Sequence, residues 1–229
     1  MSRAITCLVI ASLYIFPTDI QLAFEEAVQL LEARKAVVQK VADEQQVDWK
    51  PALAIVAPEL IRYHLLKDFF ETKALEWGYV NGGSKIADFS IGHFQMKPSF
   101  IEQLEAALAC DEKLGRRWQM LLIDAKQDEK IQRQQRIERL KDFHWQLRYA
   151  MAFCELADEM YQCRSFSSVA ERLRFYAAAY NFGFDQSPHQ IAAWQQKAAF
   201  PYGQKFQGEQ CRYSDLATAF YQQFQCSPF

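Results

Sequence analysis

Residues 52–70 read ALAIVAPELIRYHLLKDFF, and their apolar side chains fall on most faces of a helix. A helix that is apolar on most sides belongs inside a protein, so we expect this segment to be central and buried. Asp48 is placed to cap its N-terminus, and Pro51 falls in the first turn, where a missing backbone N–H costs little. Pro58 interrupts the hydrogen-bond ladder and predicts a kink directly before Glu59.

Glu59 is the chemical anomaly of this segment, because no other charged residue lies between Lys50 and Arg62. Ionising a carboxyl group among apolar neighbours is costly, so burial should raise its pKa. A raised pKa suits a general acid, which must hold a proton near neutral pH. The alternative is a structural glutamate paired with a buried arginine or a backbone N–H. Taken alone, Glu59 favours that structural role.

The rest of the pattern predicts a mainly α protein. Apolar residues recur at helical spacing over 22–41, and Pro98 is placed to open a helix that runs through Cys110. Shorter helices are expected after Pro188 and Asp215. Nothing predicts a large sheet. Residues 77–92 predict a loop, with a short hairpin turned at its Asn-Gly-Gly sequence, residues 81–83.

Two further helices are predicted in the second half of the chain. Residues 125–148 carry seven Lys or Arg and four Asp or Glu, which indicates a solvated face. An apolar seam on this segment includes His144, expected to be a satisfied core histidine, and continues to Cys154. Another helix precedes the sequence Asn181-Phe182-Gly183, with Ser165 or Ser167 as its cap.

Composition limits the classes of protein. The chain has 229 residues, of which 50% are hydrophobic and 24% charged, so it suits one domain, or one domain with an elaboration, around a substantial core. The formal net charge of −2 argues against a dedicated nucleic-acid binder, because phosphate binding depends on clustered cations.

The N-terminus has the pattern of an export signal. Arg3 supplies positive charge and the mostly apolar residues 4–16 have the length of a signal-peptide core. We therefore expect residues 1–20 to be a signal peptide or an uncleaved N-terminal anchor, with a buried helix as the alternative. Export would permit disulfides over two short loops, and mostly buried thiols are the alternative. The pairs in question are Cys154–Cys163 and Cys211–Cys226.

Two more motifs stand out against the helical background. In Gly92-His93-Phe94-Gln95-Met96-Lys97-Pro98, Gly92 would let the backbone approach a ligand closely, and the Gln95 amide can donate and accept hydrogen bonds. In Ala177-Ala178-Ala179-Tyr180-Asn181-Phe182-Gly183, small residues precede a Tyr-Asn pair at a helix end. Taken singly, the first is an ordinary loop-to-helix junction, and the second an ordinary helix end with a core tyrosine.

The order of the three motifs resembles that of the soluble lytic transglycosylase family, which shares the lysozyme-like fold with goose-type lysozymes. The resemblance covers about residues 53–183 in three islands. It implies a lysozyme-like helical domain over 21–229, with a short loop or hairpin region and a lobe enlarged by a helical insertion at about 100–165. Three features depart from the family pattern: Leu60 replaces a serine, His93-Phe94 replaces Leu-Met, and Pro58 directly precedes the glutamate.

The resemblance also assigns roles. Glu59 would be the catalytic acid/base, and Gln95, Met96 and the backbone of Gly92–Phe94 would form the wall that faces the N-acetyl sugar. Tyr180 would place its hydroxyl near the carboxylate and could hold it by a hydrogen bond, and Asn181 would support the site and contact sugar. No metal or cofactor is implied.

The implied activity is that of a peptidoglycan lytic transglycosylase, an exported, monomeric enzyme of the periplasm or cell envelope. It would cleave the β-1,4 bond between N-acetylmuramic acid and N-acetylglucosamine of glycan strands and release a 1,6-anhydro product. Partners in cell-envelope assembly stay open.

Three different functions compete with this one. The first is a lysozyme-type hydrolase in which Asp88 positions water, although Asp88 alone predicts a turn cap. The second is a non-catalytic cell-wall binding or scaffolding module, which would keep the cleft without the chemistry. The third is a helical interaction protein that docks through residues 125–148.

Overall fold

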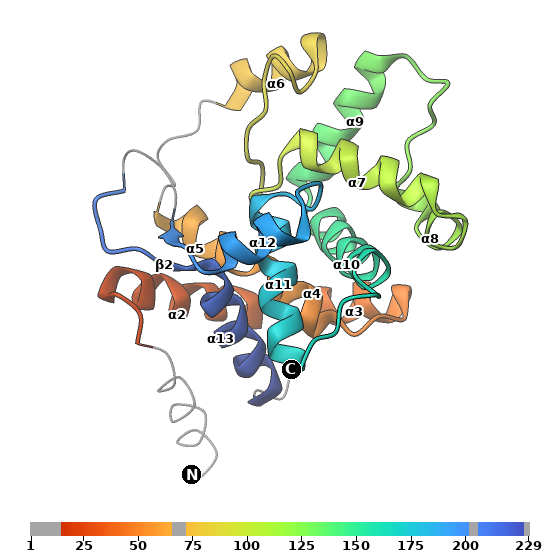
Figure 1. The fold of residues 1–229 in the computed structure, drawn as a ribbon. Coiled ribbons are helices and arrows are strands. Elements are labelled where there is room, and N and C mark those ends of the chain that lie inside the picture. Colours follow the sequence, from red (N-terminus) through yellow and green to blue (C-terminus); the bar gives the residue numbers. More distant parts are fainter. Residues whose placement is uncertain (1–14, 66–71, 202–205, 227–229) are drawn as a thin grey trace.

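The computed structural model describes residues 15–65, 72–201 and 206–226, and this part of the chain is mainly α, as predicted (Figure 1). Most of the predicted signal or anchor segment, residues 1–14, lies outside the described residues. Among the helices that are described, none combines the length and the apolar character that a membrane crossing needs.

The predicted helix over 22–41 is in fact two helices, α2 (Thr18–Ala33) and α3 (Lys35–Gln45), separated at Arg34. The interruption has a packing reason. The buried side of α2 lies against α5 (Pro58–Leu65), whereas α3 packs on α10 (Phe143–Met160), so the chain must change direction between them.

The predicted core helix is confirmed as far as residue 65. It consists of α4 (Trp49–Val56) and α5, and the break falls at Ala57, where Pro58 was expected to kink the helix. Asp48 caps α4 by accepting a hydrogen bond from the Lys50 N–H. Six of the eight residues of α4 are buried, and the helix contacts α10, α11 (Val169–Phe182) and α13 (Tyr213–Cys226).

The loop predicted over 77–92 is wrong in its first part, because α6 (Thr72–Gly82) continues through it. Gly83 ends this helix with φ of 77°, and its N–H donates to the Tyr79 carbonyl at 2.7 Å. The Asn-Gly-Gly sequence is therefore a helix end and not a hairpin. A tight turn does occur further on, where Ile91 and Met96 form an isolated antiparallel bridge.

The region predicted as an enlarged lobe comprises α7 (Pro98–Cys110), α8 (Glu112–Arg117), the 3-10 turn Gln119–Leu121, α9 (Glu129–Lys141) and α10. Helix α7 has the predicted bounds. Figure 1 shows α6, α7, α8 and α9 together at the top of the view, with α10 running back to α4.

The single charged helix predicted over 125–148 is wrong, because Asp142 ends α9 and caps α10 by accepting from the Trp145 N–H. The break at Asp142 changes which residues of 142–148 face the core, so the predicted apolar seam does not continue through His144. The His144 side chain is 46% exposed and is not a core residue. Gln146 occupies the buried position instead.

The C-terminal part surrounds α4. Ser168 caps α11, one residue beyond the predicted Ser167, whose N–H and hydroxyl both donate to Glu171. Helix α12 (Pro188–Gln195) follows as predicted, whereas α13, predicted as a shorter helix after Asp215, begins already at Tyr213 and has 14 residues. Between them strands β1 (Ala198–Phe200) and β2 (Cys211–Arg212) form a small antiparallel pair.

Neither predicted disulfide is present, because all five described cysteines are free thiols. Cys154 is buried in α10, and burial raises its pKa to about 12, whereas Cys163 lies exposed beyond the end of that helix. The alternative of mostly buried thiols is also wrong. Three of the five are exposed: Cys110, Cys163 and Cys226.

Candidate functional site

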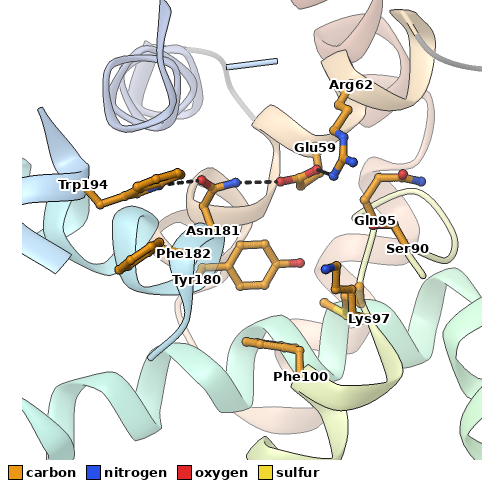
Figure 2. Close-up of a pocket in the computed structure, with 11 residues that line it drawn as sticks. Glu59, Arg62, Ser90, Gln95, Lys97, Phe100, Tyr180, Asn181, Phe182 and Trp194 are labelled. Carbon is orange, nitrogen blue, oxygen red and sulfur yellow. Dashed lines mark hydrogen bonds and ion pairs between the residues drawn. The ribbon is translucent and has the colours of Figure 1, made fainter. Parts of the chain in front are cut away.

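Glu59 lies in the first turn of α5, directly after the break from α4, and only 4% of its surface is exposed. It borders a pocket of about 340 Å³. The lining comes from segments far apart in the sequence: α5, the Ile91–Met96 turn, the start of α7, the end of α11, and α12 (Figure 2). Its residues are Glu59, Arg62, Ser90, Gln95, Met96, Lys97, Phe100, Tyr180, Asn181, Phe182 and Trp194.

The two carboxyl oxygens of Glu59 have different surroundings. Oε1 accepts a hydrogen bond from Asn181 Nδ2 at 3.2 Å. Oε2 lies 3.6 Å from Arg62 Nη1, and no described residue donates a hydrogen bond to it. Burial raises the pKa of Glu59 and outweighs the opposing effects of the Arg62 charge and the Asn181 hydrogen bond. The predicted raised pKa is therefore confirmed, although the alternative, a paired arginine, is present as well.

Asn181 is oriented by a tryptophan that sequence reasoning did not single out. Trp194 Nε1 donates to Asn181 Oδ1 at 3.0 Å, so the amide must turn its NH₂ group toward Glu59. The Trp194 ring stacks on Phe182, with centroids 4.5 Å apart and planes inclined by 16°. Trp194, Asn181 and Glu59 are thus linked by two hydrogen bonds within the lining of the pocket (Figure 2).

Tyr180 does not hold Glu59, contrary to the prediction. Its hydroxyl donates to the Phe94 carbonyl at 2.8 Å and so ties α11 to the Ile91–Met96 turn. Burial raises the pKa of Tyr180 well above its usual value, so the group stays a neutral donor. The residue still lines the pocket beside Glu59.

The prediction that Gln95, Met96 and the backbone of Gly92–Phe94 together form one wall of the site is only partly right. Gln95 and Met96 line the pocket, whereas Gly92 and Phe94 do not. The side chain of Phe94 is fully buried, and its N–H donates to Gln146 Oε1 at 3.2 Å.

Gly92 has φ of 71°, and a Cβ at this position would lie 2.0 Å from Gln146 Nε2. The glycine therefore admits α10, and not a ligand, close to the backbone.

Gln95 has a constrained backbone and one unused acceptor. Its φ of 49° is unusual for a residue with a side chain, and such conformations cost about 1–3 kcal/mol. Its Nε2 donates to the Gly92 carbonyl at 2.8 Å, but no donor among the described residues reaches its Oε1. The pocket therefore contains two buried acceptor oxygens, one on Glu59 and one on Gln95, that a ligand could satisfy.

Asp88 has a structural role. Its two oxygens accept from the N–H and the hydroxyl of Ser99, at 3.0 and 2.8 Å, at the start of α7, and Lys97 Nζ lies 3.7 Å away. It borders a neighbouring cavity of about 290 Å³ and not the Glu59 pocket. The two cavities share lining residues and thus adjoin. The shared residues are Lys97, Phe100, Tyr180, Asn181 and Phe182.

Sequence reasoning gave no role to six lining residues: Arg62, Ser90, Lys97, Phe100, Phe182 and Trp194. The spacing of Arg62 from Glu59, three positions along a helix, is a signal that could have identified it. Trp194 offers no such signal, because only the fold brings α12 beside the end of α11.

In the part of the chain that the structure describes, no group of three or more His, Cys, Asp or Glu side chains is arranged to hold a metal ion. Comparison with protein-family models, with curated proteins and with solved structures finds no match to this chain. What the arrangement offers chemically is a buried carboxyl group whose pKa is raised by burial and which borders a pocket.

Proposed function

We propose that this protein is a peptidoglycan lytic transglycosylase with a lysozyme-like fold, acting in the cell envelope with Glu59 as its single acid/base. The observation that carries the proposal is the Glu59 carboxyl group, which is buried, has a raised pKa and keeps one oxygen without a described hydrogen-bond donor beside the pocket. The ordered resemblance of the three motifs selects peptidoglycan among glycan substrates.

The proposed reaction needs one proton carrier. The Glu59 carboxyl group protonates the oxygen that links N-acetylmuramic acid to N-acetylglucosamine, and the bond from that oxygen to muramic C1 breaks. The electron-deficient C1 is stabilised by the acetamido group of the same sugar. The muramic C6 hydroxyl then attacks C1 and returns its proton to the Glu59 carboxylate. The 1,6-anhydro sugar leaves without consumption of water, and the acid is regenerated.

The shape of the site suits a glycan strand. The Glu59 pocket adjoins the cavity beside Asp88, so a chain of sugars could occupy both. Trp194 and Phe182 lie on one side of the carboxyl group and Gln95 on the other (Figure 2). Apolar ring surface together with a few placed polar groups is the composition expected of a ligand pocket.

The hydrolase alternative receives less support. A hydrolase of the predicted kind needs Asp88 to position water near Glu59. Both Asp88 oxygens already accept hydrogen bonds from Ser99, and the residue does not border the Glu59 pocket.

One observation favours a second candidate, the non-catalytic cell-wall binding module. Arg62 lies 3.6 Å from Glu59 and stabilises its ionised form, which opposes the role of an acid. In a binding module this pair would only hold the pocket open for sugar.

The test is mass spectrometry of the products released from purified peptidoglycan by the wild type and by Glu59→Gln. We expect 1,6-anhydro muropeptides from the wild type and a loss of at least about a thousandfold in the variant, because removal of a catalytic acid usually costs that order of rate. Asp88→Asn is the matched control and should keep the anhydro products.

The remaining outcomes distinguish the competing functions. Reducing-end products that disappear in Asp88→Asn would indicate a hydrolase. Binding to peptidoglycan without any product would indicate the binding module. Equal activity of the wild type and Glu59→Gln would refute the acid/base role.

A further inference from the structure

Two cationic side chains border the Glu59 pocket. Arg62 projects from α5 above the carboxyl group in Figure 2, and Lys97 projects from the residue before α7 on the same side as Gln95. The Arg62 side chain is 22% exposed and that of Lys97 is 52% exposed, so both are within reach of a ligand. An N-acetyl sugar ring without substituents is neutral and gives no reason for either charge.

While Glu59 is protonated and acts as an acid, the positive charges of Arg62 and Lys97 in the pocket are not balanced by negative charge. Arg62 forms its ion pair with Glu59, and no described residue accepts a hydrogen bond from its Nε. When Glu59 holds the proton that the proposed reaction needs, that pair is lost. Among the residues that the structure describes, the one ion pair of Lys97 is with Asp88, at 3.7 Å, which is beyond hydrogen-bond distance. An anionic group of the ligand would supply the negative charge and the hydrogen-bond acceptors that Arg62 and Lys97 then lack.

We propose that Arg62 and Lys97 form a carboxylate-binding subsite, so that the preferred substrate is a glycan strand whose muramic lactyl groups carry no stem peptide. The inference rests on the proposed function, which places muramic acid beside Glu59. In a strand that bears peptides the lactyl carboxyl group is consumed in a neutral amide bond. In a peptide-free strand it is a carboxylate, attached to the sugar whose C1 reacts.

The chemistry of both cations fits this ligand. Guanidinium binds carboxylate in a planar, two-bond geometry, and the charge-assisted hydrogen bonds are stronger than neutral ones. The Lys97 ammonium group adds three donors on a flexible chain. Stem peptides also carry carboxylates, but several bonds further from the sugar, so they are the second source that the experiment must separate.

Binding at this subsite would also prepare the acid. A ligand carboxylate would draw Arg62 away from Glu59 and add a negative charge nearby, and both effects favour protonated Glu59. Among the described residues, the Asn181 amide and the Tyr180 and Tyr213 hydroxyls also lie close to the Glu59 carboxyl group, and Lys97 lines the same pocket; of these only Lys97 carries a charge. A substrate with a free lactyl group should therefore extend activity to higher pH.

The test measures binding by isothermal titration calorimetry with Glu59→Gln, which imitates the protonated acid and cannot cleave the ligand. Three muramic oligosaccharides of equal length are compared: lactyl groups free, lactyl groups converted to methylamides, and lactyl groups carrying stem peptides. We expect the free form to bind at least about tenfold more tightly than the other two.

That preference should fall to near parity when Arg62→Met or Lys97→Met is added. Arg148→Met, which removes a cation paired with Glu44 away from the pocket, is the control and should keep it. Two substitutions are used so that poor folding of one does not decide the result.

Each outcome separates this inference from the proposed function. Equal binding of the three forms would overturn the carboxylate subsite, while cleavage by the wild type would still support the transglycosylase. Tighter binding of the peptide-bearing form, lost in Arg62→Met, would overturn the lactyl assignment and indicate a peptide carboxylate. A preference for free lactyl groups in a protein that cleaves no strand would support the subsite and refute the enzyme.

Discussion

At the scale of single residues, the proton affinity of Glu59 is set by opposing effects. Burial disfavours the carboxylate and is the largest of them. The Arg62 charge is the largest effect in the other direction, followed by the hydrogen bond from Asn181. Each opposing group can be removed by one substitution, so the order of the effects is measurable without any assay of activity.

We predict that Arg62→Met raises the pKa of Glu59 and that Asn181→Ala raises it by less. Both changes remove a group that stabilises the ionised form. The measurement is ¹³C NMR titration of the Glu59 carboxyl group. Arg148→Met is the control and should leave the titration unchanged, because its partner is Glu44. A lower pKa in Arg62→Met, or a larger rise in Asn181→Ala, would contradict this account.

These residues also show what a sequence can reveal about a site. The burial of Glu59 and its raised pKa follow from its apolar neighbours along the helix, so both were predictable. The partner of Tyr180 was not, because its hydroxyl reaches Phe94, 86 positions away in the chain. The direction in which a side chain points depends on tertiary packing, which the local sequence pattern does not encode.

At the scale of elements, the Ile91–Met96 turn is fixed by two helices that come later in the chain. From α10, Gln146 Nε2 donates to the Ile91 carbonyl at 2.8 Å and its Oε1 accepts from the Phe94 N–H. From α11, Tyr180 donates to the Phe94 carbonyl. The Ile91–Met96 turn places Gln95 at the pocket. The position of Gln95 therefore depends on the close approach of α10 to the turn.

We predict that Gly92→Ala destabilises the protein by about 3 kcal/mol or more, through left-handed strain and overpacking together. The new Cβ would lie 2.0 Å from Gln146 Nε2 and 2.5 Å from the Leu140 carbonyl oxygen. Gly83→Ala is the matched control: its φ is also positive, at 77°, but the nearest atoms lie 3.5 Å away, so strain alone should cost about 1–2 kcal/mol.

Urea denaturation of both variants measures these costs. An equal loss in the two would show that α10 does not press against the turn. A larger loss in Gly83→Ala would contradict the packing argument altogether.

Element boundaries were predictable where one residue forbids the alternative. Pro98 fixed the start of α7, and Pro58 marked the end of α4. The Asn-Gly-Gly sequence at 81–83 misled because glycine ends helices as readily as it turns hairpins, and buried Tyr79, bonded to Glu102, keeps α6 helical. Asp142 lies at a helix junction that the charged pattern of residues 125–148 concealed.

At the scale of the whole molecule, two buried carboxyl groups lie in different regions. Glu59 borders the pocket, whereas Glu105 lies among the helices of the predicted enlarged lobe. Glu105 accepts from Arg136 Nε and from the Tyr149 hydroxyl, each at 2.9 Å. Burial raises the pKa of both carboxyl groups above the ordinary value of 4.5, so pKa alone does not separate a site from a structural pair.

The effect of each substitution on stability, measured at two pH values, separates them. A folded-state pKa above 4.5 means that the folded protein keeps a proton that the unfolded chain has lost. The free energy of unfolding therefore falls as pH rises from about 4.5 toward the folded-state pKa and stays low beyond it. The cost of burying the Glu59 carboxyl group, relative to the unfolded chain, is thus present at neutral pH and absent at acidic pH.

We predict that Glu59→Gln raises the free energy of unfolding by about 1 kcal/mol at pH 7 and changes it little at pH 4.5, because it removes that cost and leaves Arg62 able to reach solvent in the pocket. Glu105→Gln should instead destabilise by about 3–5 kcal/mol at pH 7, since Arg136, only 13% exposed, loses a bonded partner. Denaturant unfolding of the wild type and of each variant at pH 4.5 and pH 7 measures the change in the free energy of unfolding that each substitution causes at each pH. A loss of stability in Glu59→Gln that is larger at pH 7 than at pH 4.5 would mean that Glu59 and Arg62 form a structural pair, and the proposed acid would lose its main support.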